Sequence, residues 1–151
     1  MAKHLNNEEI LDHQEVEAKS SPDDVLKALL STEQEVEKKY FMKRFGVDFT
    51  IRAIDGKLID RIQDRATYYE GKGSKRTKKF DEQLFGALVI QHGCITPNWN
   101  DQTLKDHYGT HDPVEVIKKR LLAGEIAKLS AEIMDLSGFG DEEDAIEAAK
   151  N

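Results

Sequence analysis

Cysteine and long apolar runs are scarce in this sequence, and each scarcity excludes a class of protein. Cys94 is the single cysteine, so no intramolecular disulfide can form and the fold does not depend on an oxidising compartment. No uninterrupted apolar run approaches the roughly 20 residues that a helix needs to span a bilayer. Residues 1–20 also lack the apolar core of a signal peptide. We therefore expect a cytoplasmic protein with no membrane partner.

Basic residues are in the minority. The 22 lysines and arginines stand against 29 aspartates and glutamates, which gives a formal net charge of -7 at pH 7. A chain of this charge repels phosphate backbones, so we do not expect nucleic acid as the main partner. At 151 residues the chain has the size of one domain, and such a domain buries roughly 70% of its unfolded surface on folding. We expect a single domain with its own core.

Both ends of the chain are acidic and poor in apolar residues. Terminal segments that bury little apolar surface gain too little on folding to become ordered. We therefore predict a mobile acidic arm over residues 1–20 and a flexible acidic tail over residues 140–151. The folded domain is predicted to occupy residues 21–139.

The first third of this domain contains the pattern of a β-hairpin. Apolar and polar residues alternate strictly over residues 47–53, which is typical of a half-buried strand. Residues 36–42 are a weaker candidate for its partner strand, and residues 43–46 have the length and the glycine of a hairpin turn. A lone hairpin is marginally stable, so we expect it to pack on helices.

Start signals predict helices over most of the remaining chain. Asp55, Asp81 and Asp112 are each placed to cap a helix, and Pro113 would occupy the first position of the third one. We interpret the basic segment 71–79 as a flexible connection between two helices.

The end of the last helix is also marked. Gly138 is placed to terminate that helix with a left-handed residue that folds Phe139 back over Met134. The fold class predicted from these elements is α+β and mainly α-helical, with one β-hairpin followed by a helical bundle.

One group of residues has the chemistry of a zinc site. Cys94, His107 and His111 have the spacing of the second half of a zinc finger, and His92 offers a fourth ligand. The first half does not fit, because a single residue separates His92 from Cys94. The alternative is that Cys94 is a small core residue and the histidines lie at helix ends or on the surface.

The basic segment offers a second alternative function. Its bases are typical of a site that neutralises phosphates in a small regulatory nucleic-acid-binding protein. They are Lys72, Lys75, Arg76, Lys78 and Lys79. No aromatic residue lies between them to stack on a base, and a solvated connection between helices has the same composition.

Motifs of catalysis are missing from the sequence. It contains no glycine-rich phosphate loop, no nucleophile elbow and no paired-histidine metalloprotease motif. Its carboxylates fall on the predicted solvent faces of helices. We therefore expect a protein that is not an enzyme, with no catalytic residues and no cofactor.

Several short pieces of sequence follow one another between residues 94 and 139: Pro97-Asn98-Trp99, Asp101, Leu104, Tyr108-Gly109, Asp112-Pro113, Leu122-Ala123-Gly124-Glu125-Ile126 and Leu136-Ser137-Gly138-Phe139. In their order and spacing they resemble the XkdN-like family of phage tail assembly chaperones. Upstream, residues 49–54, 64–67 and 80–81 and the basic segment also look like that family, so the resemblance covers most of the chain.

This resemblance implies a function and a set of partners. Members are encoded beside the tape measure gene and hold the long, aggregation-prone tape measure protein soluble in the host bacterial cytoplasm while the tail tube assembles. Other tail proteins and a frameshifted longer product that shares the same domain are further partners implied by the family, and homo-oligomers are compatible with it.

An apolar stripe near the C-terminus is our candidate for the client-binding face. Its residues recur at helical spacing, as expected for a surface that docks amphipathic client helices. They are Leu121, Leu122, Ile126, Leu129, Ile133 and Leu136. The alternative is that the stripe forms core, because a small domain needs such residues inside.

Overall fold

The computed structural model describes residues 21–32 and 36–140. Contacts divide the chain into two compact units, residues 1–34 and residues 35–151, which are described separately. The predicted mobile arm lies outside the described residues, as does the predicted flexible tail beyond Gly140. The division into arm, domain and tail therefore stays a prediction.

The first unit contributes one described helix, α2 (Pro22–Ser31). Ser21 caps it, because its side chain accepts a hydrogen bond from the Asp24 backbone N–H at 3.2 Å, and Pro22 occupies the first helical position. No side chain of α2 is buried among the described residues. Its exposed apolar side chains are Val25, Leu26, Leu29 and Leu30.

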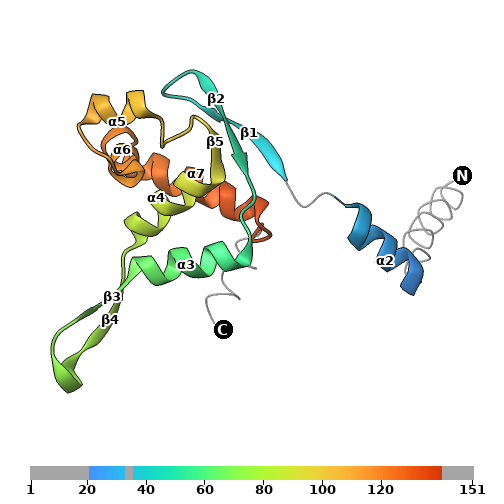
Figure 1. The fold of residues 1–151 in the computed structure, drawn as a ribbon, viewed down its shortest axis with the longest axis horizontal. Helices are drawn as coiled ribbons and strands as arrows, with labels where there is room; N and C mark the ends of the chain where they lie inside the picture. Colours follow the sequence, from blue (N-terminus) through green and yellow to red (C-terminus); the bar gives the residue numbers. More distant parts are fainter. Residues whose placement is uncertain (1–20, 33–35, 141–151) are drawn as a thin grey trace, which may run out of the picture. The chain divides into compact units, whose positions relative to one another are not determined.

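The second unit begins with a three-stranded antiparallel sheet (Figure 1). β1 (Glu37–Met42) and β2 (Val47–Arg52) form the predicted hairpin, and β5 (Cys94–Thr96) pairs with the other edge of β2. The alternation predicted for β2 places Phe49 and Ile51 in the core. The strand order is β1-β2-β5, so β1 is an edge strand with one unpaired side.

Five helices complete this unit: α3 (Gly56–Ala66), α4 (Glu82–Gly93), α5 (Gln102–Tyr108), α6 (Pro113–Arg120) and α7 (Ala123–Leu136). The predicted caps are confirmed, since Asp55, Asp81 and Asp112 each accept a hydrogen bond from a first-turn backbone N–H at 2.8 to 3.0 Å. None of the described helices is both long and apolar enough to cross a bilayer. The α+β, mainly helical fold class is confirmed.

The predicted end of α7 is also confirmed. Gly138 has a φ of 103°, and the Phe139 N–H donates to the Met134 carbonyl at 3.0 Å while the Gly138 N–H donates to the Asp135 carbonyl at 3.1 Å. These two bonds satisfy carbonyls at the end of the helix, and the positive φ is the conformation for which glycine is favoured.

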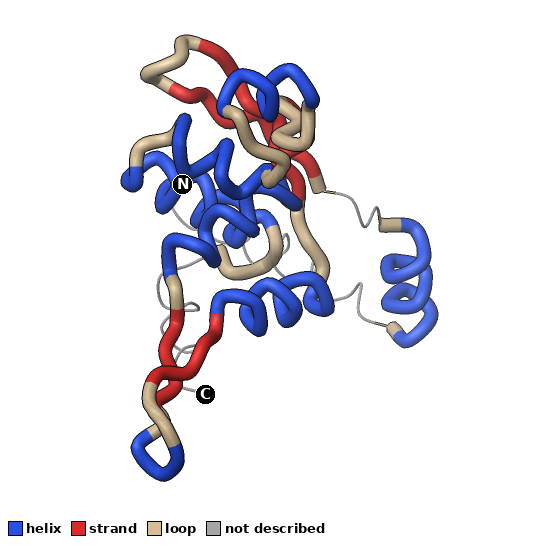
Figure 2. Tube along the Cα trace, turned by 60° about the vertical axis from the view of Figure 1, so that its left-hand side comes forward, coloured by secondary structure: helices blue, strands red, loops and turns tan. Residues whose placement is uncertain are grey.

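Residues 67–80 form a second hairpin, which corrects the predicted flexible connection. β3 (Thr67–Glu70) pairs with β4 (Thr77–Phe80) across a short 3₁₀ turn at Gly73–Lys75. Gly71, with a φ of 93°, permits the turn because a Cβ there would lie 2.7 Å from the Lys75 carbonyl oxygen. Figures 1 and 2 show the hairpin extending away from the helices.

Helix α4 forms the centre of the core. Four consecutive residues, Ala87, Leu88, Val89 and Ile90, are fully buried because α3, α6 and α7 all pack against this helix. Two glycines let α7 approach closely: a Cβ on Gly86 would lie 3.0 Å from Ile126 Cγ2, and a Cβ on Gly93 would overlap the Ile133 side chain. The α4–α7 contact therefore fixes the position of α7.

Candidate functional site

The structure divides the predicted client-binding stripe between core and surface. Helix α7 packs against α4, so Ile126, Leu129 and Ile133 are buried. Leu121, at the end of α6, is also buried, and Leu136 is half-buried. Leu122 is 58% exposed. Of the predicted residues, it is Leu122 that presents an open apolar surface.

Leu122 lines a surface groove of about 690 Å³ between β1, the β1–β2 turn and the start of α7. The groove is lined by Tyr40, Phe41, Met42, Lys43, Arg44, Leu122, Glu125 and Lys128. Phe41 is 59% exposed, much like Leu122. Large apolar side chains left open side by side are typical of a surface that docks another polypeptide. Sequence reasoning missed Phe41, because it alternates with core-facing neighbours in a weak strand.

A charge-assisted contact fixes one end of the groove. Arg44 Nη2 donates to Glu125 Oε1 at 2.6 Å and Arg44 Nε donates to Glu125 Oε2 at 3.0 Å, which is a bidentate arrangement. Arg44 Nη2 also donates to the Arg120 carbonyl at 3.1 Å. The Arg44 hydrogen bonds are the main cause that lowers the pKa of Glu125 below its ordinary value. The β1–β2 turn is thereby joined to the α6–α7 corner.

Glu125 also fixes the start of α7. Its Oε1 accepts the Leu122 backbone N–H at 2.8 Å, the bond that a glutamate at this position makes to a helix cap. Leu122 has no side-chain oxygen with which to return the bond, so Glu125 carries the cap alone. One carboxylate therefore holds both Arg44 and the backbone of the exposed leucine.

Aromatic and basic side chains close the same corner. The guanidinium carbons of Arg44 and Arg120 lie 4.5 and 4.6 Å from the centroid of the Phe45 ring, within the range of cation–π attraction. Further along β1, Lys38 Nζ pairs with Glu132 Oε2 of α7 at 3.1 Å. The groove thus lies between two elements that ion pairs hold in register.

The charge on the groove rim is mainly positive. Lys43 and Lys128 line the groove, and neither forms an ion pair among the described residues. The acid in the lining, Glu125, is already paired with Arg44. An apolar segment flanked by acidic side chains would therefore complement this surface.

The proposed zinc ligands do not converge. Cys94 is buried and its thiol donates to the Thr96 carbonyl at 3.4 Å, whereas His107 and His111 are exposed. Burial raises the pKa of the Cys94 thiol to about 11, and burial together with the charges of nearby arginines lowers the pKa of His92. Within residues 21–32 and 36–140, no three His, Cys, Asp or Glu side chains lie close enough to hold a metal ion.

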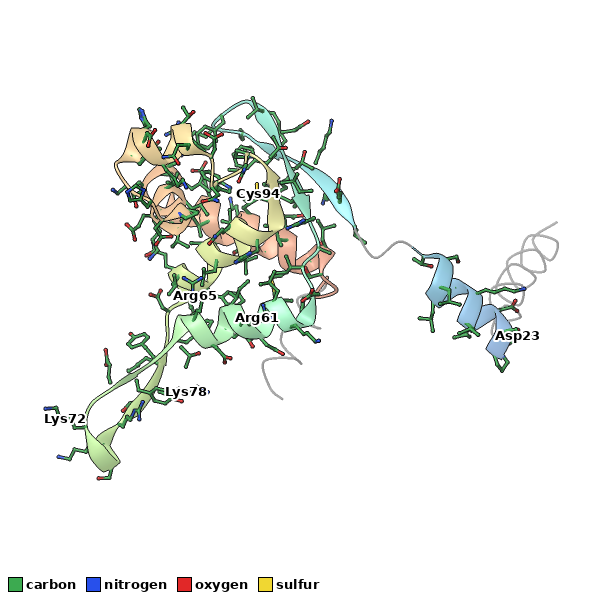
Figure 3. All side chains as sticks on the ribbon, viewed as in Figure 1. Asp23, Arg61, Arg65, Lys72, Lys78 and Cys94 are labelled. Carbon is green, nitrogen blue, oxygen red and sulfur yellow. The ribbon has the colours of Figure 1, made fainter. Side chains whose placement is uncertain are left out.

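The bases of the second alternative, Lys72, Lys75, Arg76, Lys78 and Lys79, lie on the β3–β4 hairpin, and all of them are exposed. Figure 3 shows Lys72 and Lys78 on this hairpin. Strand pairing sets Tyr68 opposite Lys79 and Tyr69 opposite Lys78. Aromatic side chains therefore do lie among the bases, which the linear order of the sequence did not indicate.

The structure is that of a small, mainly helical α+β domain with a partly apolar surface groove. The family model of the phage XkdN-like tail assembly chaperone protein matches residues 26–150. The chain therefore belongs to this family, and the resemblance seen in the sequence is confirmed.

Two proteins of Bacillus subtilis (strain 168) are similar to this chain over most of its length. The uncharacterized protein YqbN is 37% identical over 118 residues, which cover 75% of this chain and 79% of the relative. The phage-like element PBSX protein XkdN is 33% identical over 120 residues, which cover 77% and 81%. The crystal structure of YqbN matches with a TM-score of 0.55 at 27% identity, over 72% of this chain and 89% of that one.

Proposed function

We propose that this protein binds the tape measure protein and keeps it soluble during tail tube assembly, in the host bacterial cytoplasm and without catalysing a reaction. Membership of the tail assembly chaperone family supports a tail protein as the partner. A chaperone of this kind needs a surface that recognises apolar helical segments and releases them, and no bond has to be made or broken for that.

The groove between β1 and α7 is the observation that carries this proposal. Its lining includes the exposed side chains of Phe41 and Leu122 together with Lys43 and Lys128. An amphipathic client helix would place its apolar face on the two large side chains and its flanking acids beside the lysines. Such helices expose their apolar faces before the tail tube encloses them, so covering those faces prevents aggregation.

Within the predicted stripe, the exposed and the buried residues have different proposed roles. Leu122 contacts the client, and the buried side chains of Ile126, Leu129 and Ile133 hold α7 against α4 beneath it. Polar substitution of those buried residues would unfold the domain and so would not report on binding. The surface residues are the ones that test the proposal.

The test is co-expression of the tape measure protein with a Phe41→Asp, Leu122→Asp double variant. Both side chains are exposed, so the variant keeps its fold, and circular dichroism checks this. Two carboxylates in an apolar groove have to be desolvated when a client helix docks, so the soluble fraction of the tape measure protein should fall to the level seen without the chaperone.

The matched control is an Asn100→Asp, Thr103→Asp variant. It adds the same number of negative charges at exposed positions outside the groove. This control should keep the client soluble. A folded groove variant that protects the client as well as the control does would remove the proposed site, and loss of client protection by both variants would show that net charge, not the groove, matters.

Other tail proteins and a frameshifted longer product that shares this domain are part of the same proposal. An antibody raised against residues 36–140 should detect a second, larger band in cells that produce the phage, and mutation of a slippery sequence upstream of the stop codon should abolish that band. A single band of the size of this chain would remove the longer product. Light scattering at several concentrations would test for homo-oligomers.

A further inference from the structure

The β3–β4 hairpin, residues 67–80, concentrates positive charge on an acidic protein. It contains five bases and one acid, Glu70, so its formal charge is +4 while the other 137 residues carry -11. None of the hairpin's bases forms an ion pair with any described residue; the described ion pairs join Lys38 to Glu132 and Arg44 to Glu125. The positive charge of the hairpin is therefore available to a partner.

One face of the hairpin combines cations with aromatic rings. Cross-strand partners share a face, so Tyr69 lies beside Lys78 and Thr67 beside Phe80. Arg76 joins this face because its guanidinium carbon lies 4.2 Å from the centroid of the Tyr69 ring. The opposite face carries Glu70, which weakens its field, so the Tyr69 face is the more positive of the two.

Stacking orders the Arg76 side chain. A guanidinium that lies on an aromatic ring keeps its N–H groups at its edge, and those groups match the two oxygens of a carboxylate. A freely rotating arginine loses side-chain conformational entropy when it binds a partner. Because Arg76 is already stacked, part of that loss has occurred before binding. Lys78 of β4, two residues after Arg76 and on the same face, adds a second cation roughly 7 Å away.

We propose that this face of the hairpin is a docking site for an acidic segment of a partner protein, separate from the client groove. Carboxylates three or four residues apart on a helix are roughly 5–6 Å apart at their Cβ atoms, a spacing that flexible side chains extend to meet Arg76 and Lys78. Tyrosine and arginine are also the residue types that most often anchor protein interfaces. The hairpin extends away from the helices, so its two faces are accessible to a partner (Figures 1 and 2).

The rings of this face argue against nucleic acid as the occupant. Single-stranded nucleic acid binds where successive bases stack on open aromatic faces. Tyr69 already stacks with Arg76, and the Phe80 ring lies 5.4 Å from the Phe85 ring of α4.

Fluorescence anisotropy with a labelled helical peptide tests the proposal. The peptide carries glutamate at every third or fourth position, and a second peptide has glutamine at the same positions. The full-length protein should bind the glutamate peptide, more weakly as salt rises, and should not bind the glutamine peptide. An Arg76→Glu, Lys78→Glu variant should bind the glutamate peptide about ten- to hundredfold more weakly.

Further variants test whether a loss of peptide binding is specific to the charged face of the hairpin. Lys27→Glu with Lys57→Glu makes the same change in net charge at exposed positions outside the hairpin and should leave binding unchanged. Arg76→Lys keeps the charge but removes the planar fork, so binding should weaken by less than in the double reversal. The Phe41→Asp, Leu122→Asp variant should still bind the peptide, which separates failure of this site from failure of the proposed chaperone groove.

Several outcomes would overturn the proposal. Equal binding of the glutamate and glutamine peptides would show that acidity is not recognised. Undiminished binding by the folded Arg76→Glu, Lys78→Glu variant would place the site elsewhere. Tighter binding of single-stranded DNA than of the glutamate peptide, lost in the same variant, would assign the hairpin to nucleic acid instead.

Discussion

The groove and the hairpin differ in how firmly the rest of the fold holds them in place. The groove lies between two elements joined by the Arg44–Glu125 and Lys38–Glu132 pairs, and its α7 wall packs on the most buried helix of the fold. The hairpin has exposed side chains on both faces and joins the core mainly through the Phe80–Phe85 contact at its base. The first surface is held by packing and the second extends into solvent.

This difference is consistent with the kind of partner proposed for each surface. Apolar docking requires close complementarity, because a gap of about 0.5–1 Å already loses a quarter to a half of the dispersion attraction, so a groove for apolar side chains benefits from a fixed frame. Charge attraction acts over roughly 8 Å at physiological salt and tolerates movement of the charged group. We therefore expect substitutions on the hairpin to affect folding little. Substitutions beneath the groove should affect both folding and binding.

The largest effect is expected from the core beneath the groove. Ile133→Ala removes a fully buried side chain that packs against Gly93, and should lower the free energy of unfolding by about 2–5 kcal/mol. Tyr68→Ala on the hairpin removes an exposed ring and should change it by less than about 1 kcal/mol. Urea unfolding followed by circular dichroism measures both. Equal effects would contradict the contrast between the two regions.

A smaller, pH-dependent effect on the free energy of unfolding is expected from the Arg44–Glu125 contact. The hydrogen bonds from Arg44 hold the pKa of Glu125 below its ordinary value of 4.5, so the folded state favours the carboxylate. The stabilisation is complete above the unfolded pKa and is lost as pH falls through the lower folded value. Glu125→Gln should therefore reduce the loss of stability between neutral and acid pH, as measured by urea unfolding at each pH.

Asp60→Asn is the control for this measurement, because Asp60 lies exposed on α3 and has no ion-pair partner among the described residues. It should leave the acid-induced loss close to that of the parent protein. If Glu125→Gln also leaves the loss unchanged, the Arg44–Glu125 contact does not hold the β1–β2 turn to α7 in solution.

Much of the fold follows from local chemistry in the sequence. Aspartates followed by apolar periodicity mark helix starts, and Asp55, Asp81 and Asp112 all cap helices, because a carboxylate satisfies backbone N–H groups wherever the chain turns into a helix. Gly138 ends α7 for an equally local reason, the positive φ. These signals need no knowledge of what packs against the helix.

The two proposed binding surfaces do not follow from local chemistry. Phe41 and Leu122 are some 80 residues apart in the chain, and only the tertiary pairing of β1 with α7 brings them to one groove. The apolar period of α7 shows that its stripe packs against something, but it does not indicate whether that is α4 or a client. The β3–β4 hairpin was missed because its strands are short and half polar, so neither alternation nor hydrophobicity marks them.

Site-specific crosslinking tests the central claim most directly. A Leu122→Cys variant, labelled with a thiol-reactive photocrosslinker, places the reactive group in the groove, and a Lys57→Cys variant places it at the exposed start of α3. The native Cys94 is buried and its pKa is raised to about 11, so the introduced thiol reacts first. In co-expressing cells, position 122 should crosslink to the tape measure protein and position 57 should not. Crosslinks from position 57 alone, or from neither position while the client stays soluble, would contradict the groove as the client-binding site.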